Sequence, residues 1–407
     1  MTYYYGGYSK SSYKNYCAPA TYPKVTFNTY CAPTYKPTYS LKGYCAPVKP
    51  TYKIVCYKFV YNCHPVTPVE PKPTPKPEPT PKPAEPDCVD CVDDNNQNNQ
   101  FGGIDKDKGN IINVVESELG TGYAVGTDGK DTIYGTASED LIYGGDGPDV
   151  IYGGDGNDTL YGGERGDAIY GQGGKDYLQG GEGNDYLNGG AEADTMLGGD
   201  GNDVYYVDNS GDQVIEFGNA AGGIDTVRTE IDYTLPANVE NLILQGMGDL
   251  NGTGNELNND IEGNGGDNKL YGLAGDDCLI GKDGADYLDG GIGNDILIGG
   301  QGDDTYFFGR GHGHDVITDV GGDDTLLFGE GICASDLILT QKGDDLNITF
   351  KGNTDSILVS DWFTSADNQI ENFTFANGST YEVQSGYKGH HSLVCVDVIQ
   401  EQTQVCI

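Results

Sequence analysis

The sequence has few of the residues that build catalytic centres and large cores. Its 407 residues include only 1 Trp, 3 Met and 5 His, and hydrophobic residues make up 36%. No apolar run approaches the roughly 18 residues of a membrane span, and the N-terminus lacks the apolar segment of a cleaved signal peptide. The motifs HExxH and GxSxG are both absent. We therefore expect no membrane span and no enzyme activity.

Positive charge is also scarce. The chain has 23 Lys and Arg against 63 Asp and Glu, a formal net charge of −40. This balance excludes nucleic acid as a partner, because phosphates require a basic surface. Residues 1–86 nevertheless contain 11 Lys and only 3 acidic residues, all Glu. A basic arm thus precedes a very acidic body, which repels itself unless cations neutralise it.

The arm consists of repeats that are poor in aliphatic residues. Tyr-Cys-Ala-Pro occurs three times, 14 residues apart, within a Tyr/Cys/Lys/Pro-rich segment at 1–63. Residues 64–87 form a Pro-rich linker, for which polyproline II is expected. We expect the arm to be extended or disordered. It is either a solvated tail or an anchoring segment, and its composition resembles that of mussel foot adhesive proteins.

Cysteine is concentrated at the N-terminal end. Seven of the 11 Cys lie in residues 1–91, and Cys88 and Cys91 form a CxxC motif in a connector at 88–122. A zinc site would need a second ligand pair, and a thioredoxin-like site would need a βαβ context, and neither is evident. Disulfides formed after export, some of them between chains, are the favoured interpretation. Cys395 and Cys406 could close a terminal hairpin.

A period of nine governs the body. Clear units are Gly144–Tyr152 (GGDGPDVIY) and Gly153–Tyr161 (GGDGNDTLY). The sixth position is Asp in nine consecutive units, and an apolar or aromatic residue follows two positions later. The period returns at Asp277 and continues, after a two-residue slip, to Asp315 and Asp324.

The unit predicts a coil that needs a cation. The six residues GGxGxD suit a tight loop, and the next three suit a short strand with its middle side chain inward. Coils stacked about 4.8 Å apart bury these inward residues, but they also stack the aspartates. Calcium, a hard cation that takes six to eight oxygens, is the natural counterion.

The repeats resemble the repeats-in-toxin family, whose hemolysin-type calcium-binding repeat is GGxGxDxUx. The resemblance implies a right-handed parallel β-roll with two nonapeptides per coil and on the order of ten calcium ions. One edge would carry Asp131, Asp149, Asp167, Asp185 and Asp203, and the other would carry Asp140, Asp158, Asp176 and Asp194. The predicted metal site residues are Asp131, Gly144, Asp146, Asp149, Gly153, Asp155, Asp158, Asp167, Asp176, Gly180, Asp185, Asp194, Gly198, Asp200, Asp203, Asp277, Asp286, Gly290, Asp295, Gly299 and Asp304.

Some units depart from the repeat. Arg165 and Glu192 replace the glycine at position four, and Gln172 replaces the one at position two. We expect Arg165 to neutralise charge in place of an ion. Asn259 and Asn268 occupy the aspartate position at the start of the second block, where we expect calcium sites to be weak or absent.

The tyrosines at position nine predict a ladder. Five successive units end in Tyr134, Tyr143, Tyr152, Tyr161 and Tyr170. Because this position follows the inward residue, the rings must point outward. Alternate units share a face, so neighbouring rings should lie about 4.8 Å apart. The ladder either stabilises the sheet or forms an aromatic strip that binds glycans or other copies of the chain.

The predicted fold is all-β, with two right-handed parallel β-roll blocks and a C-terminal β cap behind the arm and linker. The body divides into a first roll at 123–208, a β spacer at 209–251, a second roll at 252–328, a flanking cap at 329–381 and a tail with a secretion signal at 382–407. The cap resembles the C-terminal flank of the family, and Trp362 and Phe363 are expected in its core.

The family resemblance implies export by type I secretion machinery. The sequence thus predicts a secreted calcium-binding structural or adhesive protein of a cell surface or matrix, which folds on binding calcium. Expected partners are calcium, surface or matrix glycans, and other copies of the chain through cysteines. Two alternatives stay open: a secreted enzyme with unrecognised catalytic residues, and a toxin-like effector.

Overall fold

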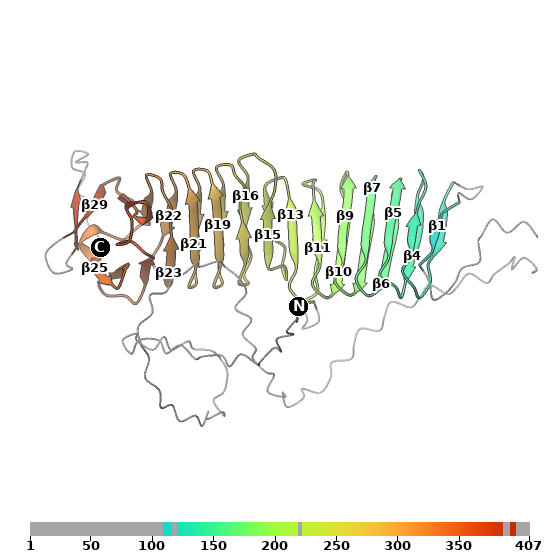
Figure 1. Cartoon of the computed structure of the whole chain (residues 1–407), viewed down its shortest axis with the longest axis horizontal. Coiled ribbons are helices and arrows are strands. Elements are labelled where there is room, and N and C mark those ends of the chain that lie inside the picture. Colours follow the sequence, from blue (N-terminus) through green and yellow to red (C-terminus); the bar gives the residue numbers. More distant parts are fainter. Residues whose placement is uncertain (1–108, 116–119, 219–221, 386–390, 396–407) are drawn as a thin grey trace, which may run out of the picture. The chain divides into compact units, whose positions relative to one another are not determined.

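The structure is a computed structural model that describes residues 109–115, 120–218, 222–385 and 391–395 (Figure 1). The predicted arm, the Pro-rich linker, the CxxC motif and Cys406 lie outside these residues. The described part contains β-strands and two 3-10 turns, η1 (Ala334–Asp336) and η2 (Ala366–Asn368). Within it, no helix has the length and apolar character that a membrane crossing requires.

One long sheet extends along the whole stack of coils. Its strands are, in spatial order, β1 (Ile111–Asn113), β3 (Thr132–Tyr134), β5 (Val150–Asp155), β7 (Ala168–Gly173), β9 (Tyr186–Ala191), β11 (Val204–Val207), β13 (Thr226–Thr229), β15 (Asn241–Leu244), β17 (Asp260–Glu262), β19 (Cys278–Asp283), β21 (Ile296–Gln301), β23 (His314–Thr318), β27 (Ser356–Val359), β26 (Asp345–Phe350) and β25 (Leu337–Lys342).

Two shorter sheets supply the other strand of each coil. The first contains β12 (Gln213–Ile215), β10 (Thr195–Asp200), β8 (Tyr177–Glu182), β6 (Thr159–Glu164), β4 (Asp140–Gly145) and β2 (Gly122–Val125). The second contains β14 (Tyr233–Thr234), β16 (Asn251–Thr253), β18 (Lys269–Tyr271), β20 (Tyr287–Asp289), β22 (Thr305–Phe308), β24 (Thr325–Phe328), β28 (Asn372–Phe375), β29 (Thr380–Ser385) and β30 (His391–Cys395).

The coils form a parallel β-solenoid of about 12 turns between residues 111 and 328, which confirms the predicted fold class. The predicted spacer does not interrupt the long sheet. Its strands β13 and β15 pair in parallel with β11 and β17, so the long sheet continues through it. Only the opposite side changes sheets, from β12 to β14. The two predicted rolls are thus joined by one continuous sheet.

The core is a ladder of inward side chains, one from each repeat strand. Ile133, Ile151 and Ile169 are fully buried, as are the corresponding leucines of the second block, and all lie in one connected cluster. Strands such as β6 alternate half-buried and buried residues, as a two-residue period requires. Burial of one aliphatic side chain per unit contributes about 1.5–3 kcal/mol, so many coils must stack to form a stable body.

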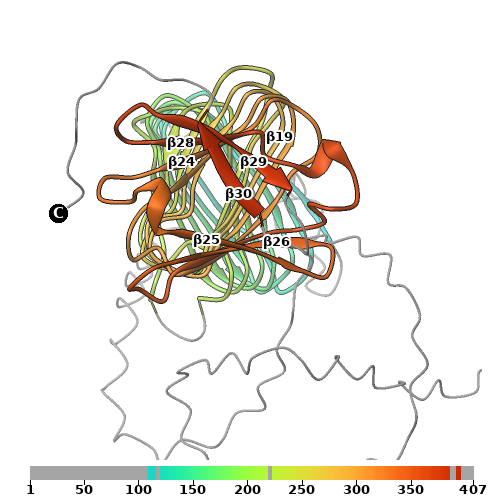
Figure 2. The ribbon, with the colours of Figure 1, turned by 90° about the vertical axis from the view of Figure 1, so that its left-hand side faces the viewer.

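The C-terminal strands close the end of the stack that follows the last coil. β27 and β28 pair in parallel with the last coil, and antiparallel strands then follow them. Viewed from this end, β25, β26 and β28–β30 lie across the coils (Figure 2). Trp362 is buried and Phe363 packs against the core, as expected.

The tyrosine ladder is confirmed on both sides. The rings of Tyr134 and Tyr152 stack with centroids 5.1 Å apart, those of Tyr152 and Tyr170 at 5.0 Å, and those of Tyr143 and Tyr161 at 4.8 Å. Interplanar angles of 5° to 12° show that neighbouring rings are nearly parallel. The geometry favours stabilisation of the sheet.

Truncation of an inward side chain should destabilise the fold more than truncation of its outward neighbour. Leu160→Ala removes a fully buried side chain and should lower the free energy of unfolding in saturating calcium by about 2–5 kcal/mol. Thr159→Ala, the matched control, changes the half-buried neighbour and should cost about 0.5 kcal/mol. Urea titration followed by circular dichroism measures both values. Equal losses would contradict the assigned direction of these side chains.

Candidate metal centre

The loops place the sixth-position aspartates in two columns. In the first column, the backbone N–H of Asp131 donates to Oδ1 of Asp149 (2.7 Å), and that of Asp149 donates to Oδ1 of Asp167 (2.7 Å). The same bond links Asp167 to Asp185 and Asp185 to Asp203. The spacing of 18 residues had predicted this column.

The second column lies on the opposite edge. It joins Asp140, Asp158, Asp176 and Asp194 by the same hydrogen bonds, at 2.8 Å each. In the second block, Asp277 is linked to Asp295, and Asp286 to Asp304. Asp315 and Asp324 extend these pairs across the two-residue slip.

The other carboxylate oxygen of most column aspartates has no partner. These side chains are between 0% and 3% exposed. Their Oδ2 atoms are buried and accept no hydrogen bond at Asp149, Asp158, Asp167, Asp176, Asp185, Asp194, Asp203, Asp277, Asp286, Asp295, Asp304, Asp315 and Asp324. Each orphaned oxygen loses its hydration without compensation, which is costly for a charged group.

The first-position glycines lie beside these oxygens. A Cβ placed on Gly144 would be 2.6 Å from Oδ2 of Asp149 and 2.6 Å from the carbonyl oxygen of Gly162 in the next coil. Gly153, Gly180, Gly198, Gly290 and Gly299 lie in the same way beside Oδ2 of the aspartate of their own unit. Carboxylate and carbonyl oxygens therefore converge where no side chain intervenes. This donor set fits calcium.

The third-position aspartates were predicted as metal ligands, but the structure does not bring them to the columns. Asp146, Asp155 and Asp200 are exposed. The N–H groups of Asp146 and Asp155 bond to carbonyl oxygens of the preceding coil, and neither side chain is buried. Arg165 is exposed as well and forms no ion pair with a described residue.

Burial sets the electrostatics of the columns. It raises the pKa of Asp149 to about 6, of Asp158 to about 7 and of Asp167 to about 8, against an ordinary value of 3.8. Hydrogen bonds from backbone N–H groups oppose the shift, and neighbouring aspartates add to it. No described ion pair involves a column aspartate. Neutrality must therefore come from protons or from cations.

Some coils satisfy their carboxylates without an ion. Oδ2 of Asp131 accepts hydrogen bonds from the N–H (2.6 Å) and hydroxyl (2.8 Å) of Thr127, at position two of the same unit. The N–H of Thr136 caps Asp140 in the same way at 2.5 Å. These first two units therefore have less need of a cation.

The side chains of the two asparagine units are satisfied by amide hydrogen bonds. Oδ1 of Asn259 accepts the N–H of Asn255 (2.7 Å), and its Nδ2 donates to the carbonyls of Val239 and Glu240. Asn268 repeats the arrangement with Asn264 and Leu250. Side-chain amides thus donate to backbone carbonyls that would otherwise face a cation. This arrangement fits the prediction that calcium sites at these units are weak or absent.

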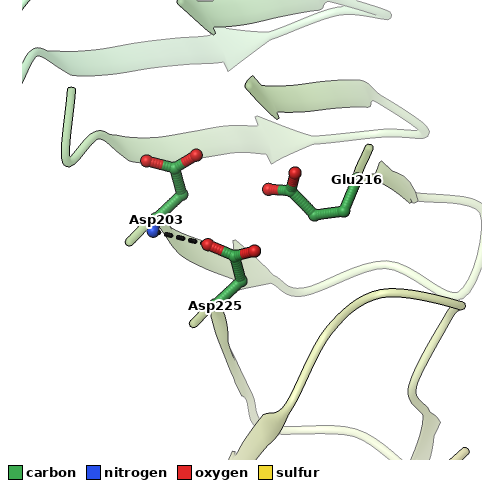
Figure 3. A group of neighbouring side chains, drawn as sticks. All are labelled: Asp203, Glu216 and Asp225. Atoms are coloured by element: carbon green, nitrogen blue, oxygen red, sulfur yellow. Dashed lines mark hydrogen bonds between the residues drawn. The ribbon is translucent and has the colours of Figure 1, made fainter. Parts of the chain in front are cut away.

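Two acidic clusters were missed from the sequence. Asp203, Glu216 and Asp225 form one buried group (Figure 3), and Asp304, Asp319 and Asp324 form the other. In each group, one ligand atom per residue lies within 4.8 Å of the others. A signal existed in the sequence, because the inward position is Tyr only in the units of Tyr205 and Tyr306.

Without calcium, the fold should be stable in acid and unstable at neutral pH. The column pKa values of about 6 to 8 exceed the ordinary 3.8, so the folded chain binds more protons than the unfolded chain between these values. The proton-linked stability is complete below about pH 4 and is lost as the pH rises through the range 6 to 8.

Circular dichroism in the presence of a chelator measures this dependence. β structure should increase on acidification from pH 8 to pH 5, whereas in saturating calcium the same change should not increase it, since protons then compete with calcium. A chelated chain that is as well folded at pH 8 as at pH 5 would contradict the role of the columns.

Comparison with known proteins identifies the repeats. Overlapping matches to the RTX calcium-binding nonapeptide repeat extend from 125 to 214 and from 253 to 314, and residues 345–384 match the haemolysin-type calcium binding protein related domain. Among curated proteins, endo-1,3-1,4-beta-glycanase ExsH of Rhizobium meliloti (strain 1021) is 42% identical over 73 residues, which are 18% of this chain and 15% of that protein.

Among solved structures, the extracellular lipase LipA from Serratia marcescens is similar at 20% identity and a TM-score of 0.22, covering 59% of this chain and 40% of the lipase. The chain thus spans well under half the length of both proteins. Residues 125–214 and 253–314 are thus RTX calcium-binding nonapeptide repeats, and residues 345–384 are a haemolysin-type calcium binding protein related domain.

Proposed function

We propose that the chain is a secreted structural protein whose repeat body folds when it binds extracellular calcium and whose arm attaches it to a surface or matrix. The observation that carries the proposal is the row of buried Oδ2 atoms without hydrogen-bond partners. A solenoid that stacks carboxylates in this way is stable at neutral pH only when cations take the place of the missing partners.

The ligands of each loop site come from two neighbouring coils. An aspartate such as Asp149 supplies Oδ2, and Gly162 of the next coil supplies a carbonyl oxygen to the same space. An ion there would join the coils and remove the repulsion between aspartates 18 residues apart. Extracellular calcium modules bind at about 10⁻⁴–10⁻³ M, so the body would stay unfolded in a low-calcium cytosol and fold after export.

The structural role rests on the composition of the arm and on the geometry of the body. Tyr, Lys and Pro in residues 1–63 suit adhesion, and the Cys residues suit crosslinking after export. Most of the buried acidic side chains of the body belong to the columns. The glycanase match covers 15% of that enzyme, so its activity does not carry over to this chain.

The calcium requirement should depend on the columns and not on charge alone. The triple variant Asp149→Asn, Asp167→Asn and Asp185→Asn removes three column carboxylates. It should raise the calcium concentration at the folding midpoint by on the order of tenfold or more, since affinity follows the number of charged ligands. Circular dichroism of the full chain during a calcium titration measures the midpoint.

A matched control removes the same charge from exposed positions. The variant Asp146→Asn, Asp155→Asn and Asp200→Asn should shift the midpoint by less than about threefold, because these side chains face solvent. Equal shifts in the two variants would mean that net charge, and not the column geometry, sets the requirement. A wild-type spectrum unchanged by millimolar calcium would exclude the proposed function.

The arm should link chains covalently. After oxidation, the protein should form multimers on non-reducing gels, because seven Cys lie in residues 1–91. Deletion of residues 1–91 should remove most of these multimers, while reduction should return the full chain to monomers. Monomers only, with every arm thiol still reactive to a thiol reagent, would contradict anchoring by crosslinks.

A further inference from the structure

At two places in the stack, an acid occupies a position that is glycine in the repeat units. Ile215 of β12 is paired with Leu197 of β10, so Glu216 lies opposite the first-position glycine Gly198. Thr318 of β23 is paired with Ile298 of β21, so Asp319 lies opposite Gly299. Both acids are buried, at 7% and 1% exposure. Each adds a third carboxylate to a pair of column aspartates.

A buried tyrosine accompanies each of these acids. The hydroxyl of Tyr205 donates to Oε1 of Glu216, and the hydroxyl of Tyr306 donates to Oδ1 of Asp319 (2.5 Å). Both tyrosines are fully buried, at the inward position that is aliphatic or Met in the other units. The pair of inward tyrosine and acid therefore recurs as a unit, once at the end of each run of repeats.

The column aspartates of both clusters are held by the same contacts. Oδ1 of Asp225 accepts the N–H of Asp203 at 2.7 Å (Figure 3), and its own N–H donates to Glu240 at 2.9 Å. In the second cluster, Oδ1 of Asp324 accepts the N–H of Asp304 at 2.8 Å. Its N–H likewise donates to a glutamate, Oε2 of Glu371, at 2.9 Å. Two segments of the chain that differ in sequence thus form the same pattern of hydrogen bonds.

Four buried oxygens of these clusters accept no hydrogen bond, whereas Oε2 of Glu216 accepts the N–H of Phe217 at 3.2 Å. Oδ2 of Asp203 is buried and unbonded, with the residue 1% exposed. In the second cluster the same holds for Oδ2 of Asp304, Asp319 and Asp324, which are 1%, 1% and 0% exposed. No described ion pair reaches either cluster. One oxygen from each of three carboxylates lies within 4.8 Å of the others, so a cation between them would compensate their buried charge.

We propose that these clusters are two end sites for a hard divalent cation, which bind it more tightly than the loop sites. The first end site is Asp203, Glu216 and Asp225, and the second is Asp304, Asp319 and Asp324. The proposal deepens the proposed function, since it concerns the same ion. All donors are oxygen, with neither His nor Cys, which selects calcium over zinc. The third carboxylate raises affinity, because ligand charge tunes calcium binding over several decades.

The test counts tight and weak calcium sites on the full chain. Equilibrium dialysis with radioactive calcium should resolve two ions per wild-type chain that bind at least about tenfold more tightly than the rest. The double variant Glu216→Gln and Asp319→Asn should lose this tight class and keep the weak class. Each single variant should lose one tight ion. Gln and Asn can still accept the tyrosine hydroxyls, so circular dichroism in saturating calcium should match wild type.

Loop and tyrosine variants distinguish the alternatives. Asp158→Asn, at a loop site, should lower weak binding and leave both tight ions in place. Tyr205→Phe keeps all carboxylates and should weaken one tight ion only a few-fold. A double variant that retains two tight ions would overturn the end sites, even if the loops bind calcium. Two tight ions without any weak class would instead overturn the proposed function and leave the end sites standing.

Discussion

Everything in this fold depends on what neutralises a stack of buried carboxylates. Coils that stack about 4.8 Å apart bury one aliphatic side chain per unit, but they also place like charges in register. Backbone N–H groups satisfy one oxygen of a column aspartate, as the N–H of Asp149 does for Oδ1 of Asp167, and leave the other oxygen without a partner in most of them. The same contact that holds neighbouring coils together therefore creates the demand for a cation. On the proposed function, folding and ion binding are one process.

The coils differ in how they meet this demand. Thr127 caps Asp131 at the start of the stack, and amides replace both the carboxylate and the ion at Asn259 and Asn268. Both asparagine units lie where the spacer joins the second block, and their side-chain amides donate to carbonyls of the preceding coil there. At the end of each block, an inward tyrosine and an additional acid close the column. On this account, calcium would bind along the middle of each run and most tightly at its end, whereas Thr127 and the asparagines supply hydrogen bonds in its place elsewhere.

The period of nine was sufficient to predict the columns, the inward ladder and the tyrosine stacks, because each follows from which residues share a face. It could not tell that Asp146 points to solvent, since the direction of a loop side chain depends on its backbone bonds. Asp319 was missed because it follows the two-residue slip. Glu216 keeps the period, 18 residues after Gly198, but was missed because the preceding unit lacks the glycines of the repeat. Strand register reveals that both acids replace glycines. The continuous sheet through the spacer was missed because β13 and β15 lack the glycines that mark the repeat.

The central claim is that ions bind where Oδ2 atoms have no partner and not where amides fill the space. Anomalous scattering from crystals grown in calcium measures this position by position. The account predicts peaks beside Asp149, Asp167 and Asp185, and none beside Asn259 or Asn268. Peaks of equal height at the asparagine coils, or a folded stack at neutral pH with no peaks along the columns, would contradict it.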